Sequence, residues 1–133
     1  MHIKTGSLKQ KVVLNAAPKK IYDLLMDSKQ HSAFSKAKAK IGRKEGDVYT
    51  AYDGYIDGKN IALVPGKLII QTWKANDGVW PADHYSIIVF DLRGSGKKTE
   101  LHFTHAEIPI DQVKEFTKGW KEHYWSRIND FLK

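Results

Sequence analysis

The sequence predicts an α+β domain in which a curved antiparallel sheet grips one long C-terminal helix. Two observations predict it: the last third of the chain carries large apolar side chains at helical spacing, and most of the chain before it alternates in short segments between turn residues, as strands do. The 133 residues are enough to bury a core without disulfides, so we expect a single domain over residues 1–133. The expected order is one strand, two short helices, a six-strand antiparallel meander and the long helix.

The N-terminal part is expected to form a strand over residues 8–15, where apolar and polar side chains alternate. Ala17-Pro18 then opens a short helix, because proline fits the first helical turn, where its missing N–H is not needed. Asp27-Ser28 ends this helix, and residues 28–34 are expected to form a second one.

Short strands separated by glycine-containing turns fill the middle of the chain. The expected strands are 37–43, 47–53, 56–64, 67–74, 84–92 and 98–106. In the last hairpin, pairing Ile88 with Phe103 and Phe90 with Leu101 gives one apolar face, so we expect this register.

That register predicts a polar cluster at the open end of the last hairpin, with Ser86 opposite His105 and His84 opposite Glu107. Two interpretations are open: polar anchors or a histidine base in an apolar pocket, or a hydrogen-bonded patch at the end of the sheet. Ser86 lacks the Gly-x-Ser-x-Gly surroundings of a hydrolase nucleophile, and His102 points to the face opposite His105. We therefore expect no catalytic residue of the hydrolase type, no metal site and no cofactor.

The C-terminal helix has a wide aromatic face, which needs a broad curved surface to pack on. Asp111 is the expected N-cap, because Ile108-Pro109 breaks the strand before it. Gly119 lies inside the helix, so either another element approaches closely there, which we favour, or the helix bends. At about 100° per residue, the apolar stripe consists of Val113, Phe116, Trp120, Tyr124, Ile128 and Phe131.

The net charge of +7 fits an acidic protein partner, whereas nucleic acid is not expected. The lysines are spread along the whole chain, and in the densest run, residues 36–44, alternation indicates a solvated strand face. No motif of a nucleic-acid-binding module accompanies them. Because the sequence holds no cysteine, no signal-peptide core and no apolar stretch long enough to span a bilayer, we expect a cytoplasmic protein without a membrane span.

Several short motifs resemble a known family, and they cover nearly the whole chain. The order of the expected strands and helices resembles that of the START-like (SRPBCC) superfamily. Within this superfamily, the motifs resemble the C-terminal domain of activators of the ninety-kilodalton heat-shock chaperone's ATPase, here as a stand-alone domain. The eukaryotic members of that family carry an additional N-terminal domain that makes much of the chaperone contact. The motifs are Tyr52-Asp53-Gly54-Tyr55-Ile56, Leu63-Val64-Pro65-Gly66-Lys67, Ile69-Ile70-Gln71-Thr72-Trp73-Lys74, Trp80-Pro81, His84-Tyr85-Ser86, Thr99-Glu100-Leu101, Gly119-Trp120 and Tyr124-Trp125.

The resemblance implies a helix-grip fold, as in START domains and the birch-pollen allergen, with one strand face turned toward the helix. Whether the aromatic side chains fill the space between sheet and helix or leave a pocket is open, because each large ring buries about 150–250 Å². Trp80, in a long connection, is either an exposed contact for a protein partner or a plug over the end of the sheet. The candidates for a ligand pocket are Tyr49, Gln71, Trp73, His84, Ser86, Phe90, Phe103, His105, Phe116, Trp120 and Tyr124.

For function, we expect a monomeric, non-enzymatic binding domain that holds a small apolar ligand between the sheet and the C-terminal helix, docks on a chaperone, or does both. The alternative that the resemblance implies is a small enzyme of the polyketide cyclase or dehydratase type, which would use His84, Ser86 and His105. No set of nucleophile, base and orienting residue can be identified in the sequence, so we prefer the binding domain.

Overall fold

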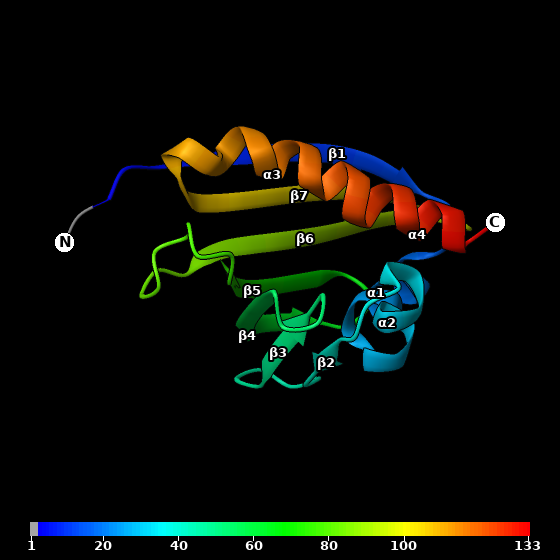
Figure 1. Ribbon diagram of the computed structural model, residues 1–133. Coiled ribbons are helices and arrows are strands. Elements are labelled where there is room, and N and C mark those ends of the chain that lie inside the picture. The colour runs from blue at the N-terminus through cyan, green and yellow to red at the C-terminus, as the bar shows by residue number, and fades with distance from the viewer. Residues whose placement is uncertain (1–2) are drawn as a thin grey trace.

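A curved antiparallel sheet and one long C-terminal helix form the two layers of the molecule (Figure 1). The computed structural model describes residues 3–133, and in this part of the chain the sheet has seven strands in the order β1-β7-β6-β5-β4-β3-β2. The expected succession of strand, two helices, six strands and a helix is confirmed. The strands are β1 (Thr5–Leu14), β2 (Lys40–Ile41), β3 (Val48–Ala51), β4 (Ile56–Val64), β5 (Leu68–Ala75), β6 (Ser86–Ser95) and β7 (Lys98–Pro109).

Two short helices, α1 (Pro18–Met26) and α2 (Ser28–Ser35), follow β1 and lie beside the C-terminal end of the long helix (Figure 1). Pro18 occupies the first turn of α1, as expected. Asp27 ends α1 and caps α2, because its carboxylate accepts a hydrogen bond from the backbone N–H of Gln30 at 2.9 Å.

The C-terminal helix is continuous but not regular. A short 3₁₀ turn (Ile110–Gln112) leads into α3 (Val113–Trp120), a π-helical turn spans Lys121–Trp125, and α4 (Ser126–Phe131) completes it. The expected N-cap is wrong: Asp111 already lies inside the 3₁₀ turn, since the chain enters that turn directly after Pro109, and no side chain caps either segment. Among the described residues, no helix is long and apolar enough to cross a membrane.

The register of the last hairpin differs from the expected one by two residues. Phe90 pairs with Phe103 and Ile88 with His105, because the turn is made by Gly96-Lys97, with Gly96 at a positive φ of 66°. A shift of two residues leaves every side chain on the same face of the sheet. The inner apolar face is therefore as expected, although the opposing pairs are not.

The core fills most of the space between the sheet and the helix. Buried aromatic rings from β5, β6 and β7 meet those of α3 and the π turn at centroid distances of 4.4 Å for Phe103–Trp120 and 5.1 Å for Trp73–Phe116. Phe131 does not belong to this face, since it is 45% exposed. The π turn explains the difference, because it changes the angular position of every residue after Lys121 relative to a regular helix.

Candidate functional site

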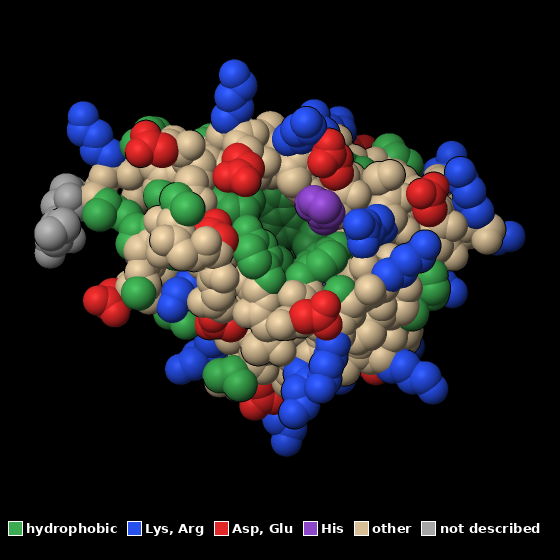
Figure 2. All heavy atoms as spheres, in the orientation of Figure 1, with side chains coloured by type: hydrophobic (Ala, Val, Ile, Leu, Met, Phe, Trp, Pro, Cys, Tyr) green, Lys and Arg blue, Asp and Glu red, His purple; other side chains and the backbone are tan. Residues whose placement is uncertain are grey.

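A cavity of about 520 Å³ opens between the C-terminal helix and the turn that joins β3 to β4. Figure 2 shows it as a hollow with hydrophobic walls, with a histidine and several carboxylates near its edge. We call it the helix–turn cavity. Its lining residues are Tyr52, Tyr55, Ile56, Trp73, Glu115, Phe116, Lys118, Gly119, Trp120, Glu122, His123 and Tyr124.

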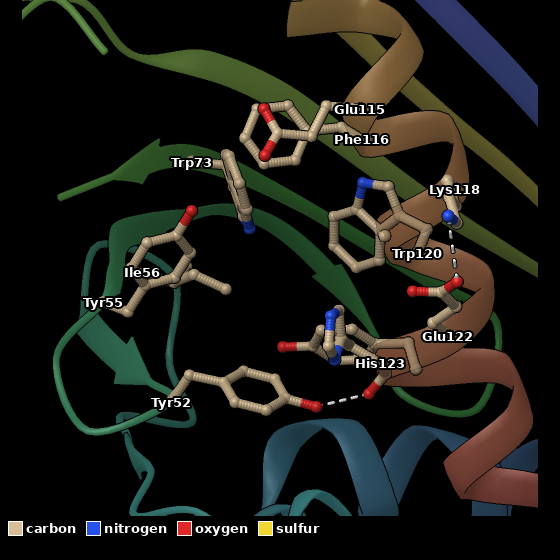
Figure 3. Close-up of a pocket in the computed structure, with 12 residues that line it drawn as sticks. Tyr52, Tyr55, Ile56, Trp73, Glu115, Phe116, Lys118, Trp120, Glu122 and His123 are labelled. Atoms are coloured by element: carbon tan, nitrogen blue, oxygen red, sulfur yellow. Dashed lines mark hydrogen bonds and ion pairs between the residues drawn. The ribbon is translucent and has the colours of Figure 1, made fainter. Parts of the chain in front are cut away.

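The β3–β4 turn forms one wall of the helix–turn cavity, and it has an unusual backbone. Tyr52 and Asp53 both adopt the left-handed conformation, with φ of 51° and 58°. Residues with a Cβ are disfavoured there by about 1–2 kcal/mol each, so contacts must hold the turn in place. Asp53 accepts the backbone N–H of Lys38 at 2.9 Å, and the Tyr52 hydroxyl donates to the backbone carbonyl of His123 in the π turn (Figure 3).

The π turn forms much of the opposite wall. A turn of this kind places residue i+5, rather than i+4, above residue i. Trp125 consequently stacks on Trp120, with ring centroids 5.6 Å apart and planes 19° from parallel, while Tyr124 still faces the core. The favoured explanation for Gly119, close approach of another element, is wrong: a Cβ there would meet only the His123 ring, at 4.0 Å. The helix instead becomes irregular two residues later, where the π turn begins.

Three of the four tryptophans have a hydrogen-bond partner for the indole N–H, and the fourth does not. Trp80, Trp120 and Trp125 donate their indole N–H to the carbonyl of His84 at 2.7 Å, to Nδ1 of His105 at 3.0 Å and to Oε1 of Gln10 at 2.6 Å. Trp73 is only 3% exposed, and its Nε1 has no hydrogen-bond partner. An unpaired buried donor costs about 1–3 kcal/mol. Figure 3 shows this nitrogen pointing from β5 into the space between Ile56 and Trp120.

In the expected polar cluster of the last hairpin, His105 and Ser86 belong to a linear series of hydrogen bonds that runs from the Trp120 indole to the carbonyl of Trp73. Since the Trp120 indole can only donate, Nδ1 of His105 accepts, and Nε2 of the neutral ring carries the proton. Nε2 therefore donates to the Ser86 hydroxyl at 2.8 Å, and this hydroxyl donates to the carbonyl of Trp73 at 2.7 Å. His84 lies apart, with its Nε2 2.6 Å from the carbonyl of Glu107.

His105 cannot act as a base toward Ser86 in this arrangement, because the nitrogen that faces the hydroxyl carries the proton. Burial also lowers the pKa of His105 to about 3, so the ring is neutral at physiological pH. The geometry matches a hydrogen-bonded patch that fixes Trp120 against the sheet.

A second buried histidine, His31 of α2, has no counterpart in the sequence-based candidates. Its Nδ1 faces the carbonyl of Leu25 at 3.1 Å, and its Nε2 accepts from the Tyr124 hydroxyl at 3.1 Å. Burial lowers the pKa of His31 to about 4, and burial also raises the pKa of Tyr124 well above its ordinary value. A single histidine in a polar segment, Ser28 to Ser35, gave no sequence signal of this role.

The structure divides the sequence-based pocket candidates into groups. Trp73, Phe116, Trp120 and Tyr124 line the helix–turn cavity. Tyr49, Gln71 and Phe90 border a separate void of about 20 Å³, the size of one water molecule, which Trp73, Trp120 and Tyr124 also line from their other side. His84, Ser86, Phe103 and His105 line neither space.

Trp80 is not an exposed partner contact. Its side chain is 5% exposed, and its ring packs against Trp73 and Phe116 at centroid distances of 5.4 and 5.8 Å. Asp77 fixes the connection by accepting the backbone N–H of Trp80 at 2.8 Å. The alternative expectation, a plug that folds back over the end of the sheet, describes its position.

Most of the cavity wall that the candidates lack comes from segments whose place beside the cavity the sequence does not indicate, although Tyr52 to Ile56 form one of the family motifs. Tyr52 and Tyr55 belong to a turn whose approach to the helix depends on the curvature of the whole sheet. The rim residues Glu115, Lys118 and Glu122 look like an ordinary solvated helix face in the sequence. In the described part of the chain, no three His, Asp or Glu side chains are grouped so that they could hold a metal ion.

A sheet that curves around one long C-terminal helix, with a cavity between them, defines the helix-grip class of START-like domains. Residues 15–133 match the family described as Activator of Hsp90 ATPase homolog 1-like protein, and the chain belongs to this family.

Known relatives agree with this assignment. The chain is 29% identical over 124 residues to the "Activator of 90 kDa heat shock protein ATPase homolog" of Dictyostelium discoideum, which covers 93% of this chain and 32% of that protein. It is 25% identical over 126 residues to homolog 1 of Homo sapiens, covering 95% of this chain and 37% of that protein. The chain thus spans about a third of the length of these relatives.

Solved structures share the fold at low sequence identity. PFC0360w, described as an HSP90 activator from Plasmodium falciparum, superposes with a TM-score of 0.87 at 20% identity, covering 95% of both chains. CalU16 from Micromonospora echinospora superposes with a TM-score of 0.74 at 19% identity, covering 96% of this chain and 74% of that one.

Proposed function

We propose that this protein is a non-enzymatic binding domain that holds a small apolar molecule in the helix–turn cavity. The size of this cavity is the observation that carries the proposal. About 520 Å³ falls within the range of about 300–1,000 Å³ that small-molecule sites occupy, although the core around it is filled with aromatic rings. The aromatic residues that make up half of the lining favour an apolar ligand.

The polar cluster supports a binding domain over the cyclase-type alternative. Ser86 and His105 are fully buried, they line neither space, and the proton on Nε2 of His105 is directed at Ser86. A substrate could reach neither side chain without opening the core. A group that satisfies its hydrogen bonds internally is typical of a structural role.

The experiment is an NMR titration of the ¹⁵N-labelled protein with a library of apolar aromatic and lipid-like molecules. We expect saturable shifts at Tyr52, Trp73 and Trp120, which line the helix–turn cavity. Gly119→Met should abolish them, because its side chain would project into the helix–turn cavity from a helical position with open space around it.

Gly119→Ala is the matched control, since it changes the same position but adds only one methyl group. It should bind as the unchanged protein does. If no member of the library shifts any lining residue, or if Gly119→Met binds as well as Gly119→Ala, the helix–turn cavity is not a ligand site and the proposal fails.

We infer that docking on a 90 kDa heat-shock chaperone is a second function of this domain. It is supported by the relatives named as activators of that chaperone's ATPase, and the net charge of +7 suits an acidic protein surface. The test is a titration of the labelled protein with the 90 kDa chaperone of the same organism. Shifts on exposed residues are expected, and an unchanged spectrum at saturating chaperone would contradict the inference.

A further inference from the structure

We propose that the helix–turn cavity selects uncharged aromatic molecules with one hydrogen-bond acceptor, a carbonyl oxygen, and that this oxygen accepts the Nε1–H of Trp73. The proposal rests on the proposed function, because it names the class of ligand for the same cavity. It is carried by the contrast between Trp73 and the three other tryptophans.

The fold supplies an acceptor to every indole except that of Trp73. Trp80, Trp120 and Trp125 are each paired within 3.0 Å, and they are as buried as Trp73. The other buried polar atom without a partner in residues 3–133 is Oε1 of Gln112, which lies at the start of the C-terminal helix and does not line the helix–turn cavity. Trp73 therefore combines the unpaired donor with a place on the wall of the helix–turn cavity, and its ring also borders the void of about 20 Å³ behind it.

Apart from Tyr55 and His123, which are exposed, the other aromatic donors that line the helix–turn cavity are already bonded. The Tyr52 hydroxyl is bonded to the carbonyl of His123, the Tyr124 hydroxyl to His31, and the Trp120 indole to His105. Ile56 and Phe116 are apolar. A ligand that reaches this wall consequently finds one polar requirement, an acceptor for Trp73, and otherwise aromatic faces and edges.

Charge excludes a carboxylate or phosphate as that acceptor. One indole N–H cannot replace the hydration shell of a buried anion. At the mouth, Lys118 is paired with Glu122 at 3.8 Å, whereas Glu115 takes part in no ion pair within the described residues. An anionic group at the mouth would therefore meet a carboxylate. A neutral carbonyl satisfies both conditions.

The test compares 1-tetralone with tetralin, which share the fused-ring shape and differ in the carbonyl. Binding is followed by the indole ¹⁵N–¹H signals of the labelled protein. We expect 1-tetralone to bind about tenfold more tightly, the effect of one hydrogen bond to an otherwise unpaired donor. The Trp73 indole signal should move downfield, while the signals of the three paired indoles move little. The anion 1-naphthoate should bind more weakly than 1-tetralone.

Trp73→Phe should remove the preference for the ketone, and Trp80→Phe is the matched control. Trp80 packs on Trp73 in the same aromatic cluster, but its N–H is already bonded to the carbonyl of His84, so Trp80→Phe should keep the preference. Should Trp73→Phe fail to fold, the affinity ratio and the Trp73 signal of the unchanged protein decide the matter.

Two outcomes separate this proposal from the proposed function. Equal affinities for 1-tetralone and tetralin, with cavity signals shifted but the Trp73 indole unmoved, would overturn the selectivity and leave the ligand site intact. Tighter binding of 1-naphthoate than of 1-tetralone would equally overturn it. If no molecule shifts any lining residue, the ligand site itself is wrong.

Discussion

His31 and His105 are held as neutral rings inside the protein, and each is bonded to an aromatic residue of the C-terminal helix. His105 accepts from Trp120, and His31 accepts from Tyr124. Desolvation lowers both pKa values, to about 3 for His105 and about 4 for His31. Protonating either ring would place a charge in the core and break the bond to the helix.

Acidification should therefore destabilise the fold through these two residues. Because both folded-state pKa values lie below the unfolded value of 6.5, the unfolded chain binds more protons between about pH 4 and pH 6.5. The stabilising effect is complete above pH 6.5 and is lost as the pH falls. From pH 7 to pH 5 we expect a loss of about 2 kcal/mol per histidine in the free energy of unfolding, measured by urea denaturation.

Substitutions isolate this effect from the carboxylates. The His105→Gln variant has no ring to protonate at this position. The part of the pH dependence of its free energy of unfolding that comes from the two buried histidines should therefore fall by about half, in addition to a general loss of stability. The control is His123→Gln, which removes a histidine from an exposed position outside the core. Identical slopes for all three proteins would refute the assignment.

At the scale of elements, a hydrogen bond across the helix–turn cavity links the β3–β4 turn to the π turn. Tyr52 joins them through its hydrogen bond to the carbonyl of His123, and the Arg127 guanidinium lies 5.9 Å from the centre of the Tyr52 ring. The turn is strained and the helix is irregular at the same place. Irregular backbone of both kinds is frequent at functional sites.

Tyr52→Phe should loosen this contact. We expect a loss of about 1 kcal/mol in the free energy of unfolding, the usual value for one hydrogen bond, and faster amide exchange in residues 52–55. Tyr55→Phe is a suitable control, since its hydroxyl lies 3.5 Å from Asp77 and adds little. An equal effect of the two substitutions would show that the link through Tyr52 does not hold the turn.

Gly119 offers a second measurement at this scale. Alanine is preferred over glycine in a helix by up to about 1 kcal/mol, and a Cβ at this position meets nothing closer than 4.0 Å. Gly119→Ala should therefore raise the midpoint of thermal unfolding. Gly58→Ala should lower it, because a Cβ there would lie 2.0 Å from the backbone carbonyl of Thr72. A destabilised Gly119→Ala would mean that the π turn requires glycine beside it.

For the whole molecule, positive charge is the property that bears on a protein partner. Exposed lysines are concentrated in residues 36–44 and are scattered elsewhere. If the chaperone is bound through this run, affinity should fall as ionic strength rises, since exposed charges are screened over about 10 Å at 0.1 M salt.

Charge reversal tests this prediction directly. The triple substitution Lys38→Glu, Lys40→Glu and Lys44→Glu should weaken chaperone binding about tenfold or more in calorimetry at low salt. Reversal of Lys9, Lys67 and Lys98, which are also exposed but dispersed, changes the net charge equally and should have a smaller effect. Equal losses for the two triples would mean that net charge alone, and not the run, attracts the partner.

Local patterns in the sequence were sufficient for the fold but not for the site. The order of elements, the inner face of the sheet and the aromatic stripe all follow from periodicity, which depends on neighbours along the chain. The register of the last hairpin was missed because the position of a two-residue turn decides it. Phe131 and Gly119 were misjudged because a π turn leaves no mark in an apolar pattern.

The candidate site depends on contacts between distant segments. Four of the eleven pocket candidates line the helix–turn cavity. Phe116, Trp120 and Tyr124 belong to the helical stripe that periodicity identifies, and Trp73 belongs to the strand face that the family resemblance implies. Tyr52 and Tyr55 reach it only through the curvature of the sheet, and His31 matters only because α2 packs beside Tyr124. Trp80 was expected at the surface as one alternative, but its indole finds a partner inside, in the carbonyl of His84.

The π turn has a consequence in genetic terms. Loss of one codon inside an α-helix turns everything after it by about 100° and normally removes the apolar face from its partner. Residues 121–125 already contain one residue more than a regular turn needs. Deleting Lys121 would convert this segment to ordinary α-helix and leave Ile128 facing the sheet. A chain that is one residue shorter at this point can therefore keep the same apolar pattern to its end.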